Sequence, residues 1–254
     1  MDSPRGTLYL VPNTLDLGAD PPPDIRDTLP LATIALAARL PNWLAESAKT
    51  TRAFLKRVDA VVPLATPLQQ VSIVELPRPA KGAAPAPGSK LEELLAPLLR
   101  GEPVGLISEA GLPAVADPGA AVVAAAHRAG LRVEPLAGSS SLLLALAASG
   151  LQGQRFAFVG YVPQDAGERA ARLRQLEQRS RREGETQILI ETPYRNAALL
   201  AALVATLQPT TRLSVSIGLT LADGHTRSDS VAQWRAVPHE PRNDRPAVFC
   251  FLAA

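Results

Sequence analysis

The chain has 254 residues with a net charge of +2, and 46% of its residues are hydrophobic but only 4% aromatic. This length fits one large domain or two of ordinary size, and the scarcity of aromatics favours helices packed on a sheet over a β-sandwich. The small net charge argues against a protein that coats nucleic acid, and the single Cys250 excludes an internal disulfide. Because no signal peptide precedes the first strand and no apolar run reaches the ~18 residues of a membrane span, we expect a soluble, cytoplasmic protein without a membrane segment.

The first half of the sequence alternates short apolar runs with helical stretches. Strands are predicted at residues 8–12, 42–45, 103–108 and 131–136, and helices at 28–39, 46–58, 91–100 and 120–129, with Gly130 ending the last helix. Residues 77–89 are rich in proline and glycine, so a mobile surface loop is expected there. Repeated units of strand, small-residue loop and helix are typical of a parallel open sheet.

The second half continues this alternation less regularly. Strands are predicted at 156–161, 187–191, 212–219, near 230 and at 247–252, and helices at 142–148, 166–182 and 195–207. The two strands at the end of the chain permit a mixed sheet. We therefore predict an α/β protein of two domains, with a mostly parallel sheet in residues 1–140 and a mixed sheet in residues 141–254.

Three loops of the first half are the main candidates for a ligand site. Residues 12–18, 109–119 and 137–141 each follow a predicted parallel strand, so all three should open on the same edge of the sheet. Their small side chains let backbone groups approach a ligand closely, although tight turns alone would also explain them. No loop matches G-x-G-x-x-G or G-x-x-x-x-G-K-[ST], so the usual machinery of a nicotinamide or ATP site is absent.

Other patterns leave two interpretations open or exclude a function. Asp117 could contact a ligand or cap the helix that follows it. The arginines between residues 169 and 182 could meet phosphates or form a solvated helix face. His127, His225 and His239 have no metal-ligand spacing, so no metal site is expected, and the serines at 139–141 have no evident partner base for hydrolysis.

Taken in order, five motifs resemble the tetrapyrrole methylase superfamily, and within it the branch of the ribosomal RNA small-subunit 2′-O-ribose methyltransferases. The most specific is L-I-S-E-A-G-L-P with A-D-P-G at residues 106–113 and 116–119, which is similar to I-S-D-A-G-x-P…D-P-G. The others are G-T-L-Y-L-V-P at 6–12, P-L-A-G-S-S-S at 135–141, F-V-G-Y-V-P at 158–163 and I-E-T-P-Y-R at 190–195.

The resemblance implies a two-domain homodimer that binds S-adenosylmethionine between its domains and needs no metal. The family's cofactor contacts fall on matching positions of this sequence. They are Pro12, Glu109, Ala110, Gly111, Asp117, Pro118, Gly119, Ser140, Pro163 and Pro193.

The methyl acceptor stays open, because two family motifs differ here. The A-E-D-T-R motif is replaced by A-E-S-A-K-T-T-R at 45–52, and R-E-L-T-K by I-G-L-T-L at 217–221, which lacks both charged ends. Our hypothesis makes Glu46 the base or acceptor-binding group and Arg52 and Arg195 anchors for an anionic substrate, although Glu46 and Arg52 could instead form an ion pair. The acceptor could be ribosomal RNA or a small molecule such as a tetrapyrrole, or the protein could be an inactive cofactor-binding partner.

Overall fold

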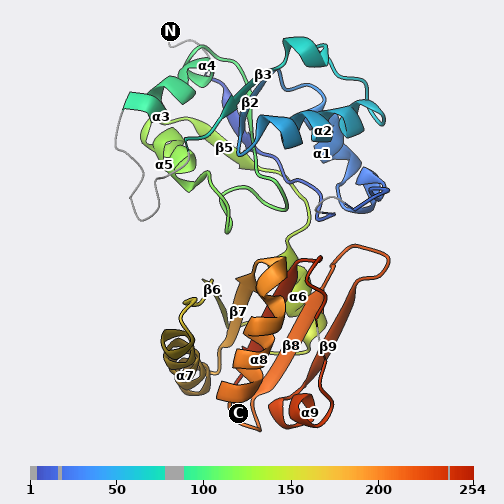
Figure 1. The fold of residues 1–254 in the computed structure, drawn as a ribbon. Coiled ribbons are helices and arrows are strands. Elements are labelled where there is room, and N and C mark those ends of the chain that lie inside the picture. Colours follow the sequence, from blue (N-terminus) through green and yellow to red (C-terminus); the bar gives the residue numbers. More distant parts are fainter. Residues whose placement is uncertain (1–4, 17–18, 78–88, 240) are drawn as a thin grey trace. The chain divides into compact units, whose positions relative to one another are not determined.

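The computed structural model describes residues 5–16, 19–77, 89–239 and 241–254. The chain divides into two compact units, Met1–Ser139 and Ser140–Ala254, each built on its own sheet (Figure 1). The predicted loop at 77–89 lies almost wholly outside the described residues. None of the described helices is long and apolar enough to span a membrane.

The first unit has a five-stranded sheet in the order β3-β2-β4-β1-β5, and all its neighbouring strands pair in parallel. This confirms the predicted parallel sheet. The strands are β1 (Thr7–Leu10), β2 (Asn42–Ala45), β3 (Ser72–Glu75), β4 (Val104–Ile107) and β5 (Arg132–Pro135).

Helices cover both faces of this sheet (Figure 1). One face carries α1 (Leu31–Ala37) and α2 (Ala48–Asp59), and the other carries α3 (Ser89–Leu94), α4 (Ala96–Leu99) and α5 (Ala120–Arg128). Short 3-10 turns lie at Ile25–Asp27 (η1) and Leu68–Gln70 (η2). Alternate residues of the central strands enter the two cores: Ile107 packs with α1 and α2, and Leu106 with α4 and α5. Burial on both faces explains why these strands read as continuous apolar runs.

Local signals set the start of α2 and the end of α5, the latter at Gly130 as predicted. The Ser47 side chain accepts a hydrogen bond from the Thr50 backbone and so caps α2. Gly130 follows the C-cap residue of α5 with a φ of +65°, a conformation that glycine adopts without steric cost.

The second unit has a mixed sheet in the order β6-β7-β10-β8-β9, in which only β6 and β7 pair in parallel. This confirms the prediction of a mixed sheet. The strands are β6 (Phe156–Gly160), β7 (Thr186–Glu191), β8 (Arg212–Ile217), β9 (His225–Ser230) and β10 (Ala247–Leu252).

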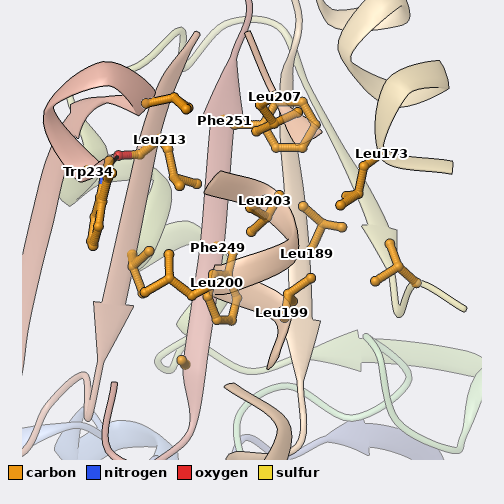
Figure 2. Close-up of a cluster of buried hydrophobic side chains, with 14 of the residues drawn as sticks. Leu173, Leu189, Leu199, Leu200, Leu203, Leu207, Leu213, Trp234, Phe249 and Phe251 are labelled. Atoms are coloured by element: carbon orange, nitrogen blue, oxygen red, sulfur yellow. Dashed lines mark hydrogen bonds between the residues drawn. The ribbon is translucent and has the colours of Figure 1, made fainter. Parts of the chain in front are cut away.

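Helix α6 (Ser141–Ser149) packs on one face of the second sheet, and α7 (Ala166–Glu183), α8 (Asn196–Thr206) and α9 (Val231–Ala236) pack on the other. A 3-10 turn at Pro193–Arg195 (η3) leads into α8. Figure 2 shows the larger core, where Phe249 and Phe251 of β10 lie among leucines of α7 and α8. The buried Trp234 of α9 donates its indole N–H to the Leu213 carbonyl at 2.8 Å, so its polar atom is satisfied within this core.

Candidate functional site

The first sheet changes winding direction between its neighbouring strands β1 and β4. The chain leaves β1 toward α1 on one face and leaves β4 toward α5 on the other. In open α/β sheets, ligands bind beyond the carboxyl ends of strands at such a switch point. The loops after β1 and β4 therefore form the candidate site of the first unit.

Asn13 joins these two loops. Its backbone N–H donates to the Gly111 carbonyl at 2.9 Å, and its side-chain amide donates to the carbonyls of Ser108 at 3.1 Å and Glu109 at 3.0 Å. The side-chain oxygen of Asn13 accepts from the Thr14 backbone at 2.9 Å. Because Asn13 is only 5% exposed, these bonds fix the two loops against each other.

The third predicted loop, which follows β5, lies against the first. A Cβ atom added to Gly138 would stand 2.3 Å from Pro12 Cγ, so only glycine permits this approach. The Thr33 hydroxyl donates to the Ala137 carbonyl at 2.8 Å, and the Ser139 hydroxyl donates to the Thr28 carbonyl at 3.1 Å. The structure thus confirms that all three small-residue loops meet at one edge of the sheet.

Glu46 belongs to the same edge. It directly follows β2, and its backbone N–H donates to the Ile107 carbonyl at 3.1 Å. Its carboxylate oxygen Oε2 accepts from the Glu109 backbone N–H at 3.0 Å. A half-buried acid is therefore held against the loop that carries the most specific motif of the sequence.

Asp117 adds a third acid to Glu46 and Glu109. Partial burial, the charge of Glu46 and, less strongly, the charge of Glu109 raise the pKa of Asp117 to about 6, against a hydrogen bond with Ser108 that lowers it. Asp117 lies two residues before Gly119, the N-cap residue of α5, and no side chain caps this helix within the described ranges. The capping interpretation of Asp117 is therefore wrong, and the acid contributes to a negatively charged cluster.

The loop between Gly111 and Gly119 has an unusual backbone. Ala114 and Ala116 adopt φ values of +65° and +66°, which cost side-chain-bearing residues of the order of 1 kcal/mol each. Gly111 and Gly119 have φ values of +66° and +132°, and the Ala114 N–H donates to the Pro118 carbonyl at 3.2 Å. Strained backbone of this kind concentrates at ligand sites. The predicted contacts Gly111, Pro118 and Gly119 belong to this loop, and Ala110 directly precedes it.

Arg52 lies elsewhere on α2. It is exposed, and among the residues that the structure describes no ion pair joins it to Glu46, so the predicted alternative of a Glu46–Arg52 pair is not found. Arg57 of the same helix instead donates to Asp16 at 2.6 Å, to Thr14 at 3.1 Å and to the Pro23 carbonyl at 2.9 Å. Helix α2 thus fixes the loop after β1 through Arg57, while Arg52 makes no ion pair or side-chain hydrogen bond within the described part of the chain.

The remaining predicted residues belong to the second unit. Ser140 is the N-cap residue of α6. Pro163 and Pro193 follow β6 and β7, and because these strands are parallel neighbours both prolines lie at the same edge of the second sheet. Arg195 forms an ion pair of 2.9 Å with Glu191, whose side chain is 2% exposed. Arg195 therefore already has a buried structural partner.

Among the residues that the structure describes, no group of three or more His, Cys, Asp or Glu side chains is arranged to hold a metal ion.

The profile of the Tetrapyrrole (Corrin/Porphyrin) Methylases matches residues 41–233, more than half of the chain. The chain belongs to this family. A relative in Xylella fastidiosa named ribosomal RNA small subunit methyltransferase I is 40% identical over 124 residues, which are 49% of this chain and 44% of the relative. A relative of the same name in Mesorhizobium japonicum is 36% identical over 171 residues, 61% of this chain and 57% of the relative. The matched part of the chain thus spans about half the length of these relatives.

A solved structure of a uroporphyrin-III C-methyltransferase from Thermus thermophilus, complexed with S-adenosylhomocysteine, has the same two-unit α/β fold. It superposes with a TM-score of 0.52 at 21% identity and covers 97% of both chains. At this identity the likeness shows the fold alone.

Within this tetrapyrrole methylase chain, sequence reasoning found the site loops but not Asn13 as the residue that joins them. A polar residue directly after a buried strand was a usable signal, since such a side chain must find partners. Its actual partners, the Ser108 and Glu109 carbonyls, lie 95 and 96 residues away in the sequence and follow from the fold.

Proposed function

We propose that the protein is an S-adenosylmethionine-dependent methyltransferase whose acceptor is small-subunit ribosomal RNA, at a ribose 2′-hydroxyl. Family membership supports methyl transfer, and the names of the relatives support RNA as the acceptor. The observation that carries the proposal is the meeting of three acids and three small-residue loops at the switch point of the first sheet.

The residues at this edge fit S-adenosylmethionine chemically. The cofactor carries positive charge on its sulfonium and amino groups, and Glu46, Glu109 and Asp117 supply a complementary negative field. The backbone at Gly111 and Gly138 can approach a flat adenosine closely because no Cβ intervenes. We assign cofactor binding to the predicted set: Pro12, Glu109, Ala110, Gly111, Asp117, Pro118 and Gly119 from the first unit, and Ser140, Pro163 and Pro193 from the second.

When bound, S-adenosylmethionine would supply an electrophilic methyl group, so the protein must place the acceptor and take up its proton. We assign the proton to Glu46, because the Glu109 N–H fixes one of its oxygens and so orients the carboxylate. Exposed Arg52 is the better anchor for an anionic acceptor, since Arg195 is held by Glu191.

A second acceptor class, a small molecule such as a tetrapyrrole, is favoured by one observation. Residues 217–221 lack the charged ends that the RNA-modifying branch carries in the matching motif. A protein that binds the cofactor but transfers no methyl group is the third interpretation. The names of the relatives favour RNA over both.

Methyl-tritiated S-adenosylmethionine offered with deproteinised small-subunit ribosomal RNA, intact small subunits, uroporphyrinogen III and a small-molecule extract would separate the three. The proposal expects label in RNA, recovered after alkaline hydrolysis in dinucleotides because a 2′-O-methyl group blocks cleavage at its own phosphodiester. Label only in the small-molecule pools would favour the second class. No transfer to any pool, with the cofactor bound, would favour the third.

We also propose a homodimer, as the resemblance implies. The exposed side of α6 is apolar, with Leu143 52% and Leu144 38% exposed and alanines at positions 147 and 148. An apolar face on a surface helix is typical of an interface. Light scattering of the purified chain should give twice the monomer mass, and a monomer at micromolar concentration would contradict the proposal.

A further inference from the structure

Helix α7 presents a concentrated basic face. It packs on the second sheet through Leu173 and Leu176, which are 0% and 1% exposed. On its outer side, five arginines are exposed within eleven residues: Arg172, Arg174, Arg179, Arg181 and Arg182. We call these five residues the α7 basic face. The whole chain has a net charge of only +2, so this excess is local.

The acid that interrupts the run in the sequence does not neutralise this face. Glu177 is 4% exposed, and its carboxylate accepts hydrogen bonds from the Gln208 backbone at 2.7 Å and from the Thr211 hydroxyl. It is the only acid between residues 169 and 182. The fold thus directs the negative charge inward and the arginines outward.

Two of the five guanidinium groups have no partner among the residues that the structure describes. Arg179 pairs with Glu185 at 2.9 Å, Arg182 pairs with Glu183 at 2.7 Å, and Arg181 donates to the main-chain oxygen of Ala254 at 2.8 Å. Arg172 and Arg174 make no side-chain hydrogen bond or ion pair with any part of the chain that the structure describes. Each leaves a full set of N–H donors for an external anion.

The spacing of the face suits an extended polyanion. Arg172, Arg179 and Arg182 lie at i, i+7 and i+10, on one side of the helix and about 15 Å from first to last. Arg174 and Arg181, at i and i+7, form a second row on the opposite flank of the helix, roughly 160° around its axis from Arg172 and Arg179. The row from Arg172 to Arg182 is long enough to face several successive phosphates of a nucleic acid, and the second row flanks the exposed half of the helix on its other side. Guanidinium groups bind phosphate oxygens in bidentate geometry.

We propose that the α7 basic face binds the phosphodiester backbone of the RNA acceptor. This inference rests on the proposed function, in which the acceptor is RNA. The contacts carry no base information, so they hold the substrate on the protein while selection of the modified ribose takes place at the catalytic edge.

The test compares two double variants with the same loss of charge. Arg172→Gln/Arg174→Gln removes the two unpartnered guanidinium groups of the face. Arg39→Gln/Arg128→Gln removes two exposed arginines of the first unit that have no side-chain partner within the described ranges. The probes are a labelled RNA hairpin of arbitrary sequence and deproteinised small-subunit ribosomal RNA, titrated between about 50 and 200 mM salt.

The proposal expects the first variant to bind both RNAs at least about fivefold more weakly and to lower the slope of log K against log salt by about 2. In methyl transfer its KM for RNA should rise at unchanged kcat, and Arg172→Lys/Arg174→Lys should restore most of the affinity. The control variant should keep the wild-type slope. If the two arginines only stabilised the fold, their loss would not lower the salt slope and raise the KM for RNA at unchanged kcat, and lysine would not restore the affinity.

Three results would overturn the inference. Equal RNA affinity and slope for the first variant and the control would make the face a solvated surface, while RNA methylation by the wild type would leave the proposed function intact. Absence of RNA binding by the wild type would end both the inference and the RNA acceptor. If the first variant lost the wild type's binding to phosphatidylglycerol vesicles but bound RNA as tightly as the wild type, the face would be a membrane-binding surface instead.

Discussion

The carboxylate of Glu46 accepts a hydrogen bond of 3.0 Å from the backbone N–H of Glu109. This bond ties the end of β2 to the loop that follows its neighbour β4, and it engages only one carboxylate oxygen. Among the described residues, the second oxygen makes no hydrogen bond. The acid is thereby oriented by one oxygen, with the other available to a substrate.

Substitution of Glu46 by Gln tests the assigned proton acceptor. The amide oxygen can still accept from the Glu109 N–H, so the loop should keep its position, whereas the basic carboxylate is lost. We expect kcat for methyl transfer to a hydroxyl to fall about 10²- to 10⁴-fold, with cofactor affinity changed far less. Glu134→Gln, at an exposed ion pair of β5, is the control. Unchanged turnover with the cofactor bound would remove Glu46 from this role.

The raised pKa of Asp117 predicts a dependence of stability on pH. Between the ordinary carboxyl pKa of 3.8 and the folded value of about 6, the folded protein binds more protons at this site than the unfolded chain does. The contribution of Asp117 to the free energy of unfolding therefore falls as pH rises through this window and is constant above it. Asp117→Asn lacks this titration. The free energy of unfolding of the variant minus that of the wild type, measured in urea, should therefore be more favourable to the variant at pH 7 than at pH 4. A difference independent of pH would show that the pKa is not raised.

Loss of the Asn13 side chain should weaken the connection between the loops after β1 and β4. Asn13→Ala leaves the buried Ser108 carbonyl and the Glu109 carbonyl without their amide donor, which should lower the free energy of unfolding by about 2–3 kcal/mol. The affinity for S-adenosylmethionine should fall as well. Asn243→Ala, at an exposed position, should stay within about 0.5 kcal/mol of wild type. Equal stability of the two variants in urea would contradict the joining role of Asn13.

Gly138 offers a test of the contact between the first and third loops. In Gly138→Ala the new methyl group would stand 2.3 Å from Pro12 Cγ, so the loops must separate. We expect S-adenosylmethionine to bind at least about tenfold more weakly, a cost of about 1.4 kcal/mol. Gly153→Ala is a matched control, because nothing lies within 4 Å of its new Cβ. Calorimetry that gave the same affinity for both variants would place the cofactor away from this contact.

Arg195 distinguishes a structural pair from a substrate anchor. Arg195→Gln leaves Glu191, 2% exposed, without its cation, and breaking a buried pair costs about 3–5 kcal/mol. Since the arginine is 20% exposed, we expect a loss near the lower end of this range, partly restored by adding Glu191→Gln. A variant with full stability but a raised KM for the acceptor would instead support the anchor hypothesis.

The central elements of both sheets could be predicted because buried strands leave continuous apolar runs, as at β2 and β10. The edge strand β3 was missed: its sequence S-I-V-E is short and mostly exposed. Helix α9 was also missed, since its six residues are stabilised by a capping box at Ser230 and by packing of Trp234 rather than by a long periodic pattern. β9 was only located approximately, because H-T-R-S-D-S has no apolar alternation.

The candidate site was predictable in part for the same physical reason. Parallel strands bring their carboxyl ends to one edge, so the three loops could be placed together from the sequence. The bond between Glu46 and Glu109 joins residues 63 positions apart, so it follows from tertiary packing, which local patterns do not encode. The pair of Arg195 with Glu191 spans only four positions, but it forms where β7 ends and η3 begins, and no helical or strand periodicity predicts a pair there.

Isothermal titration of S-adenosylmethionine into the wild-type chain tests the central claim most directly. We predict saturable binding of one cofactor per chain, competed by S-adenosylhomocysteine and weakened in Gly138→Ala but not in Gly153→Ala. A wild-type protein that is folded by circular dichroism and yet gives no saturable heat with either compound would contradict the account.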